Sequence, residues 1–235
     1  MAVSRVVRLA TWNVQHGHPD PDALGAAVAS LAADVVSLQE VDRFTGRVGG
    51  RDLLARAAEA SGLVAVDGHV VRFDGGTYGN ALLVHPDLLD TGGSPQLLHR
   101  PWWPPWRRPE PRGCVAATLR GGLVVVGAHL GLRRRSERSH QLDGLLRAAG
   151  EGPAVVLADL NALPDEVRPH ADRHRFTMVD VPAAFPASAP RAVIDHVLVR
   201  GVTARPCPDA GRPVVSDHRP VLVELDYLRS ASPRL

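Results

Sequence analysis

The stretch PAVVLADLNALP, residues 153–164, joins an apolar segment to two polar side chains. Residues 153–158 are small and β-branched, which is typical of a strand buried on both faces. Asp159 closes that strand, and Asn161 follows two residues later. Because a buried carboxylate is costly without a hydrogen-bonding, charged or metal partner, this end of the strand is a candidate functional position. The structural alternative is an Asx turn before Pro164.

Five further apolar segments carry polar residues at one end. They are TWNV with Asn13, LQEVD with Glu40, GAHLG with His129, IDHVLV with Asp195 and His196, and SDHRPV with Asp217 and His218. Polar groups at strand ends can converge on one rim of a sheet, where loops open to solvent. One such residue would carry little weight, but six segments together predict a shared site. Asp217 and His218 cannot both face one side of a strand, so we expect them in a loop before Pro220.

Composition limits the class of protein. A chain of 235 residues suits a single α/β domain spanning residues 1–235, and 45% hydrophobic residues are enough for a large core. The net charge of +2 is smaller than the positive charge that a DNA-coating protein usually carries. Cys114 and Cys207 are too few for a disulfide framework or a cysteine metal cluster. No segment has the pattern of a signal peptide or a transmembrane helix, so a cytoplasmic location is expected.

The pattern of apolar residues predicts strands of two kinds alternating with helices. Strands are expected over residues 6–14, 34–41, 63–73, 78–84, 115–119, 123–130, 153–158, 192–199 and 220–225. Helices are expected over residues 23–32, 52–61 and 136–149. A hairpin around Gly121 and Gly122 argues against a purely parallel sheet. The predicted fold class is therefore α/β (α+β), with two packed mixed β-sheets and helices outside.

The motif NALP after a buried Asp159, together with SDHRPV near the C-terminus and TWN near the N-terminus, resembles the endonuclease/exonuclease/phosphatase superfamily, also called DNase-like. The resemblance covers residues 5–226. It implies a four-layer α/β sandwich and hydrolysis of a phosphate ester. It also implies a divalent cation, usually Mg²⁺, with Mn²⁺ as the substitute.

The resemblance assigns metal binding to three residues. Glu40 is similar to the main metal ligand of the family, and a hard carboxylate oxygen suits Mg²⁺. The alternative for Glu40 is an ion pair with Arg43. Asn13 would contact the metal or a phosphate oxygen, although an Asn at this point can also simply form a turn. Asp217 would be a further metal ligand.

The remaining matched residues would act on water and on the phosphoryl group. His218 resembles the general base or electrostatic partner of the family. Asp195 would bind the other ring nitrogen of His218 and fix its tautomer. Asp159 would position or deprotonate the attacking water, and Asn161 and His129 would donate hydrogen bonds to the phosphoryl oxygens. A lone His129 on an apolar strand would otherwise be a satisfied core residue.

Two departures from the abasic-site endonuclease branch reduce the expectation of DNA repair. That branch carries an Asp where this chain has Gln15, and tends to carry a Tyr where this chain has His129. His129 instead resembles the DNase, sphingomyelinase and small bacterial phosphodiesterase branches. Asn80, in YGNALLV, matches a family motif and is expected to support the site, whereas His196 receives no role.

Two segments are candidates for substrate selection. Residues 101–112, PWWPPWRRPEPR, include Trp102 and Trp103, which could stack on bases, enter a membrane interface or cover the edge of the sandwich. The covering role is the interpretation we favour. Residues 132–138, LRRRSER, follow GAHLG, and Arg133 could bind a phosphate-rich ligand or lie at a solvated helix start.

Three functional hypotheses follow. The first is a Mg²⁺-dependent phosphodiesterase or nuclease whose substrate is a phosphate ester, with nucleic acid among the candidates. The second is the same chemistry on a lipid or small phosphoester, as in sphingomyelinases. The third is a catalytically silent family member that binds partners through its Trp/Arg loop, and the complete set of matched residues argues against it.

Overall fold

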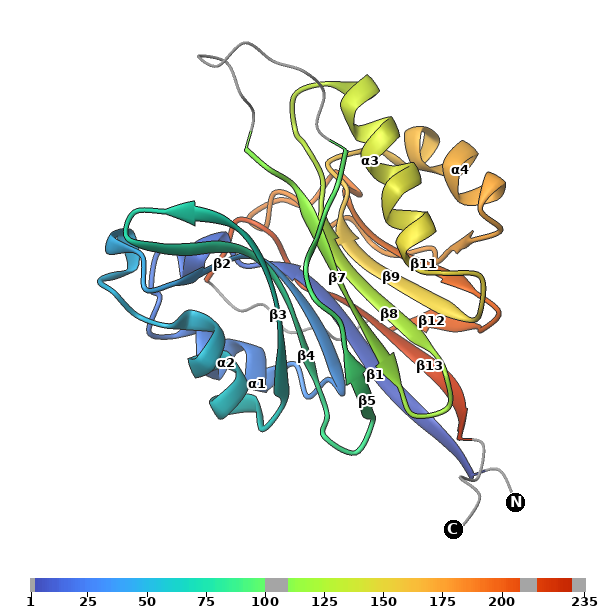
Figure 1. Ribbon diagram of the computed structural model, residues 1–235, viewed down its shortest axis with the longest axis horizontal. Coiled ribbons are helices and arrows are strands. Elements are labelled where there is room, and N and C mark those ends of the chain that lie inside the picture. Colours follow the sequence, from blue (N-terminus) through green and yellow to red (C-terminus); the bar gives the residue numbers. More distant parts are fainter. Residues whose placement is uncertain (1–2, 100–109, 208–214, 230–235) are drawn as a thin grey trace.

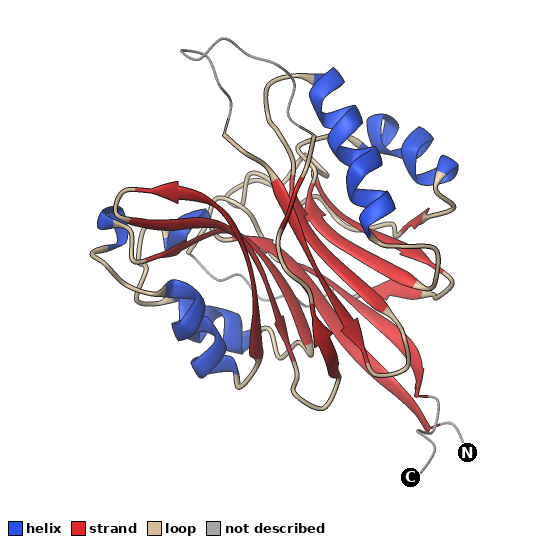
Figure 2. Cartoon of the chain, in the orientation of Figure 1, coloured by secondary structure: helices blue, strands red, loops and turns tan. Residues whose placement is uncertain are grey.

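Two mixed β-sheets occupy the centre of the molecule (Figures 1 and 2). The structure, a computed structural model, describes residues 3–99, 110–207 and 215–229. The first sheet has the order β12-β13-β1-β2-β4-β3, and the second has the order β10-β11-β9-β8-β7-β5, with β6 paired to β7. Only β1 with β2, and β8 with β9, run parallel among the described pairs. The strands are β1 (Val3–Asn13), β2 (Val35–Arg43), β3 (Val64–Phe73), β4 (Gly76–Val84), β5 (Leu89–Gly92), β6 (Gln96–Leu97), β7 (Gly113–Leu119), β8 (Val124–His129), β9 (Ala154–Asp159), β10 (Thr177–Met178), β11 (Asp195–Arg200), β12 (Ala204–Pro206) and β13 (Val221–Arg229).

Helices cover the outer face of each sheet. Figure 1 shows α1 (Leu24–Ser30) and α2 (Leu53–Ser61) beside the first sheet, and α3 (Arg135–Ala148) and α4 (Pro164–Arg173) beside the second. Two 3-10 turns, η1 (Gln15–Gly17) and η2 (Gly46–Val48), lie in the connections. The four-layer α/β sandwich expected from the sequence is confirmed. No helix among the described residues combines the length and apolar character needed to cross a membrane.

Three apolar clusters fill the spaces between the layers. The largest lies between the sheets and takes side chains from both, including Leu9 and Leu82 from the first and Val115 and Val155 from the second. The other two lie under the helices, one below α1 and α2 and one below α3 and α4. Strands buried on both faces explain why the sequence shows continuous apolar runs instead of alternation.

The sheets approach closely near the end of the sandwich where β2 and β9 terminate. Ser37 in β2 donates a hydrogen bond of 2.9 Å to the carbonyl oxygen of Leu157 in β9, across the two sheets. Gly127 in β8 faces the same point, and a Cβ there would lie 2.6 Å from Ser37 Oγ. Because glycine has no side chain, the two backbones can come together here. The contact sets the relative position of strands that carry polar residues from both sheets.

Several elements were not predicted from the sequence. Helix α4 was missed, although Pro164 at its first turn and the acidic Asp165 and Glu166 are normal signals of a helix start. Its apolar pattern is weak, since only Val167 and Ala171 are buried, and an internal proline interrupts it. Strands β5, β6, β10 and β12 have two to four residues, which is too short to show a period.

Candidate active site

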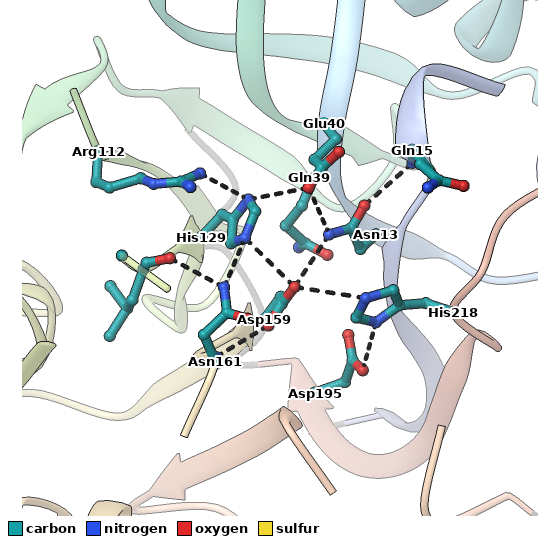
Figure 3. A network of polar contacts seen from close by, with 12 residues as sticks. Asn13, Gln15, Gln39, Glu40, Arg112, His129, Asp159, Asn161, Asp195 and His218 are labelled. Atoms are coloured by element: carbon teal, nitrogen blue, oxygen red, sulfur yellow. Dashed lines mark hydrogen bonds and ion pairs between the residues drawn. The ribbon is translucent and has the colours of Figure 1, made fainter. Parts of the chain in front are cut away.

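Asn13 connects the two sheets at the end of the sandwich. It is the last residue of β1, and its side chain is buried. Its Nδ2 donates to Glu40 Oε1 at 3.1 Å and to Asp159 Oδ2 at 3.0 Å, while its Oδ1 accepts from the backbone N–H of Gln15 at 3.0 Å. One amide therefore holds a carboxylate from β2 and a carboxylate from β9 next to each other (Figure 3).

Glu40 lies at an irregularity of β2. The pairing of β2 with β4 shifts register between Leu38 and Val41, and Glu40 has a φ of 58°. Its side chain is 23% exposed, in contrast to its buried neighbours in the strand. A bulge of this kind interrupts the alternating directions of side chains along a strand and turns one side chain to a new direction. Here it brings the Glu40 carboxylate to within 3.9 Å of His129 Nδ1.

Three polar residues of the second sheet lie at one level on neighbouring strands. His129 of β8 and Asp195 of β11 are each paired in register with Asp159 of β9. The parallel strands β8 and β9 end at this level, whereas β11 is antiparallel to β9 and begins there. The sequence pattern placed Asp195 at the end of an apolar segment, and the structure shows that it opens the strand. All three side chains are buried.

Asn161 turns back towards this row of side chains. The residue has a φ of 49°, and its backbone N–H donates to Asp159 Oδ1 at 3.0 Å. This is the Asx geometry that the sequence suggested as a structural alternative. The same conformation puts Asn161 Nδ2 2.9 Å from His129 Nε2 and 3.1 Å from the carbonyl oxygen of Leu130. The turn thus serves to place an amide donor beside His129.

His218 and Asp195 form a buried hydrogen-bonded pair. His218 Nδ1 lies 2.8 Å from Asp195 Oδ2, and His218 Nε2 lies 3.9 Å from Asp159 Oδ2. The loop holding His218 is anchored from outside the pair. Trp12 Nε1 donates to the carbonyl oxygen of His218 at 2.9 Å, and Ser216 Oγ accepts from its backbone N–H at 3.0 Å. The expected orientation of His218 by Asp195 is what the geometry provides.

Burial and neighbouring charges shift the pKa values of three of these groups. Burial would lower the pKa of His218, but the hydrogen bond and charge of Asp195, with Asp159 nearby, raise it to about 9. Burial and the Asp195 charge raise the pKa of Asp159 above its ordinary range. Burial, then Arg112 and His218, hold the pKa of His129 well below 6.5. The cluster thus contains a charged imidazole next to a carboxyl group that ionises with difficulty.

Strained backbone accumulates in the same region. Non-glycine residues with positive φ include Glu40 at 58°, Asn161 at 49°, and Gln15 and His16 at 43° and 48°. A left-handed conformation costs of order 1 kcal/mol or more for such residues and persists where the surrounding structure demands it. Glu40 and Asn161 carry side chains of the cluster, and Gln15 and His16 lie two and three residues after Asn13.

Three other predicted residues make no hydrogen bond to the cluster among the residues that the structure describes. Asp217 is exposed, and no described contact joins its carboxylate to the buried cluster; its backbone oxygen instead accepts from Ala187 at 2.6 Å. Asn80 is buried and donates to the carbonyl oxygen of Gly113 at 2.8 Å. Arg133 is exposed before α3.

Trp102 and Trp103 lie outside the described residues. His196, which received no role, donates from Nε2 to the carbonyl oxygen of Ala162 at 2.8 Å, on the far side of β11 from Asp195. The structure therefore separates the adjacent residues Asp195 and His196 onto opposite faces of the strand.

Sequence reasoning did not single out Arg112. This residue precedes β7, its side chain is 15% exposed, and its Nη1 lies 3.0 Å from both His129 Nδ1 and Glu110 Oε1. Arg112 also lines a small hollow together with Glu40, Tyr78, Asn80, Glu110 and His129. The fold shows that Arg112, at the end of segment 101–112, meets the cluster.

The donors fit a hard divalent cation. Glu40, Asp159 and Asp195 bring carboxylate oxygens to one end of the sandwich, and ligand atoms of Asp159, Asp195 and His218 lie within 4.8 Å of one another. Asp195 Oδ1 is a buried oxygen without a hydrogen-bond partner among the described residues. Oxygen ligands of this type suit Mg²⁺ or Mn²⁺ better than a soft metal. Of the predicted ligands, Glu40 and Asn13 lie in this cluster, whereas Asp217 is exposed, and their binding of a metal stays a prediction.

Comparison with known structures supports the fold. The chain is similar to an endonuclease/exonuclease/phosphatase from Beutenbergia cavernae, with 21% identity over 94% of this chain and 72% of that one, at a TM-score of 0.72. It is also similar to a family protein from Bacteroides thetaiotaomicron, with 18% identity over 96% of each chain and a TM-score of 0.70. The human nocturnin catalytic domain, solved with a bound sulfate anion, shares 16% identity over 96% of this chain and 97% of that one, at a TM-score of 0.66.

A search of the curated proteins finds no match to this chain. The family model described as the endonuclease/exonuclease/phosphatase family matches residues 10–218, which include every member of the cluster from Asn13 to His218. Since members of this family are hydrolases of phosphate esters, the match agrees with the carboxylate, amide and imidazole groups assembled here. The chain belongs to the endonuclease/exonuclease/phosphatase family.

Proposed function

We propose that this protein is a divalent-metal-dependent phosphodiesterase or nuclease that attacks a phosphate ester with water. One observation carries the proposal: polar residues from both sheets meet at one end of the sandwich. Asn13, Glu40 and the loop residue His218, which precedes β13, come from the first sheet, and His129, Asp159, Asn161 and Asp195 come from the second sheet and the loop after β9. These residues come from six separate segments of the chain. A purely structural role would not require so many costly buried polar groups in one place.

The metal would be held chiefly by the carboxylate of Glu40, with Asn13 beside it. When bound, Mg²⁺ would supply positive charge to the phosphoryl oxygens. Asp217 is not included, because its exposed carboxylate lies apart from the cluster. Mn²⁺ has the same preference for oxygen ligands and is the proposed substitute.

Side chains of the cluster would activate the attacking water and stabilise the charge on the phosphoryl group. Asp159 has a raised pKa and lies between Asn13 and His218, which suits it to orient a water and accept its proton. His218 is held by Asp195 as an imidazolium that faces the cluster, so it would stabilise negative charge on the phosphoryl group. Asn161 and His129 would donate hydrogen bonds to the phosphoryl oxygens.

We also propose that residues 1–235 act as a single domain, because the central apolar cluster takes side chains from both sheets. A cytoplasmic location remains our expectation from the sequence. The ester itself is left to experiment. Candidates are nucleic acids, lipid phosphodiesters of the sphingomyelin type and small phosphate esters.

The test is hydrolysis of an activated phosphodiester by the purified protein with Mg²⁺ or Mn²⁺. We expect turnover that EDTA abolishes, and a panel of DNA, RNA, sphingomyelin vesicles and phosphomonoesters run in parallel would identify the substrate class. Glu40→Gln and His218→Ala should each lower kcat by several orders of magnitude. Glu59→Gln, a matched change of an exposed residue on α2, should retain full activity. A protein inactive on the entire panel would refute the proposal.

A further inference from the structure

Arg112 determines which nitrogen of His129 carries the proton. An arginine side chain has only N–H donors, so at 3.0 Å from His129 Nδ1 it requires that nitrogen to accept a hydrogen bond. The single N–H of the neutral ring is then on Nε2. An imidazolium, with a proton on each nitrogen, would direct an N–H at the guanidinium and is incompatible with this contact.

A second contact to the ring, from Asn161, favours the opposite tautomer and is the weaker of the two. Asn161 Nδ2 lies 2.9 Å from His129 Nε2, and it also donates to the carbonyl oxygen of Leu130 at 3.1 Å. Rotating the amide would place its oxygen against that carbonyl oxygen, so the nitrogen must face the ring. A hydrogen bond from a charged donor is roughly twice as strong as one from a neutral amide. The charged contact with Arg112 therefore decides the tautomer.

Two N–H groups consequently meet in the cluster. His129 Nε2–H and Asn161 Nδ2–H lie side by side, and Asp159 Oδ2 lies 3.4 Å from Nε2 (Figure 3). Two adjacent donors of this kind suit an oxygen that only accepts, such as a phosphoryl oxygen. Glu110, 3.0 Å from the same Nη1 of Arg112, holds the guanidinium in place behind the ring.

We propose that Arg112 is a positioning residue that keeps His129 as a neutral Nε2–H donor. In this role His129 binds a phosphoryl oxygen of the substrate and does not transfer a proton to the leaving group. The inference rests on the proposed function for its substrate, but the tautomer follows from the contacts alone. It adds Arg112 and Glu110 to the residues on which turnover depends.

The tautomer can be measured without substrate. In protein labelled with ¹⁵N-histidine and treated with EDTA, the imidazole nitrogens of His129, assigned with a His129→Asn variant, should show a protonated Nε2 and an unprotonated Nδ1. Arg112→Met removes the donor and should shift the ring towards the Nδ1–H form, which can accept from Asn161. Arg168→Met, an exposed change on α4, should leave the signals unchanged. A wild-type ring protonated at Nδ1 would overturn the inference even if the variant failed to fold.

Kinetics provide the second arm of the test. Loss of a group that orients another residue typically costs on the order of 10- to 100-fold. Arg112→Met should lower kcat by this factor with little change in KM, because Arg112 acts through His129. A rise in KM with unchanged kcat would show direct substrate binding instead and would overturn the positioning role. If the wild-type protein hydrolyses nothing, the proposed function fails, whereas the ¹⁵N measurement still decides the tautomer.

Discussion

Replacing Asp195 by Asn tests the charge pair at the centre of the cluster. Asp195 is fully buried and lies 2.8 Å from His218 Nδ1. The change keeps the size and a hydrogen-bonding group but removes the negative charge. The difference between the ordinary pKa of 6.5 and the value of about 9 for His218 corresponds to ~3 kcal/mol of preference for the imidazolium, at ~1.36 kcal/mol per pKa unit. Burial of the ring opposes this preference, and the hydrogen bond and charge of Asp195 are its largest source, with smaller contributions from the charges of Asp159 and Asp217.

We expect the pKa of His218 in Asp195→Asn to fall by about 2 units or more, so that a large part of the rings loses its charge at neutral pH. The assay is an NMR titration of the His218 ring in the metal-free protein, with Asp165→Asn on the exposed start of α4 as the matched control. Loss of the orienting charge should also lower kcat, by about 10²- to 10⁴-fold as for an Asp that orients a catalytic His. A His218 ring that still titrates near 9 in the variant would refute the reasoning, whatever happens to the rate.

The same pair links stability to pH. The folded protein raises the pKa of His218 above 6.5. The charged ring therefore contributes fully to the free energy of unfolding below pH 6.5, and this contribution is lost as the pH rises through about 9. Asp195→Asn should therefore destabilise the protein more in mildly acidic than in alkaline solution. Urea unfolding at several pH values checks this, and a loss that grows with pH would contradict it.

Three further predictions concern the frame around the site. Gly68→Ala would put a Cβ 2.7 Å from Val115 where β3 packs on β7, and overpacking of this kind should cost ~1–3 kcal/mol in urea unfolding; an equally stable variant would show that the sheets can separate there. Burial would raise the pKa of Asp52, but Arg43 and the N–H of Ala55 lower it below 3.8. The ionised Asp52 therefore stabilises the protein above pH ~4, and this stabilisation is lost at lower pH. The loss of stability in Asp52→Asn should shrink as the pH falls. A difference in stability between wild type and variant that does not change with pH would count against the ion pair. Addition of Mg²⁺ should raise the unfolding temperature by mass action and EDTA should reverse the rise; no change at millimolar-range Mg²⁺ would argue against a site among the carboxylates.

Sequence alone was sufficient for the layers and for most of the residues at the site. Long apolar runs such as residues 153–158 are local features, and burial of strands on both faces leaves a direct mark on composition. The polar residues that interrupt these runs were visible for the same reason, so Asn13, Glu40, Asp159 and His218 could be named. Helix α4 could not, because packing of Val167 and Ala171 on the second sheet outweighs a weak local pattern.

Tertiary structure alone decided which of these groups touch. The pairing of β11 antiparallel to β9 puts the first residue of one strand beside the last residue of the other, and this is why Asp195 meets Asp159. The fold also turned Asp217 to solvent and brought Arg112 to His129, across 17 positions of sequence. Local patterns record burial and backbone preference, whereas contacts between distant segments depend on strand order and register. The sequence of this protein therefore determined its layers and its chemically active residue types, and strand register determined how those residues pair.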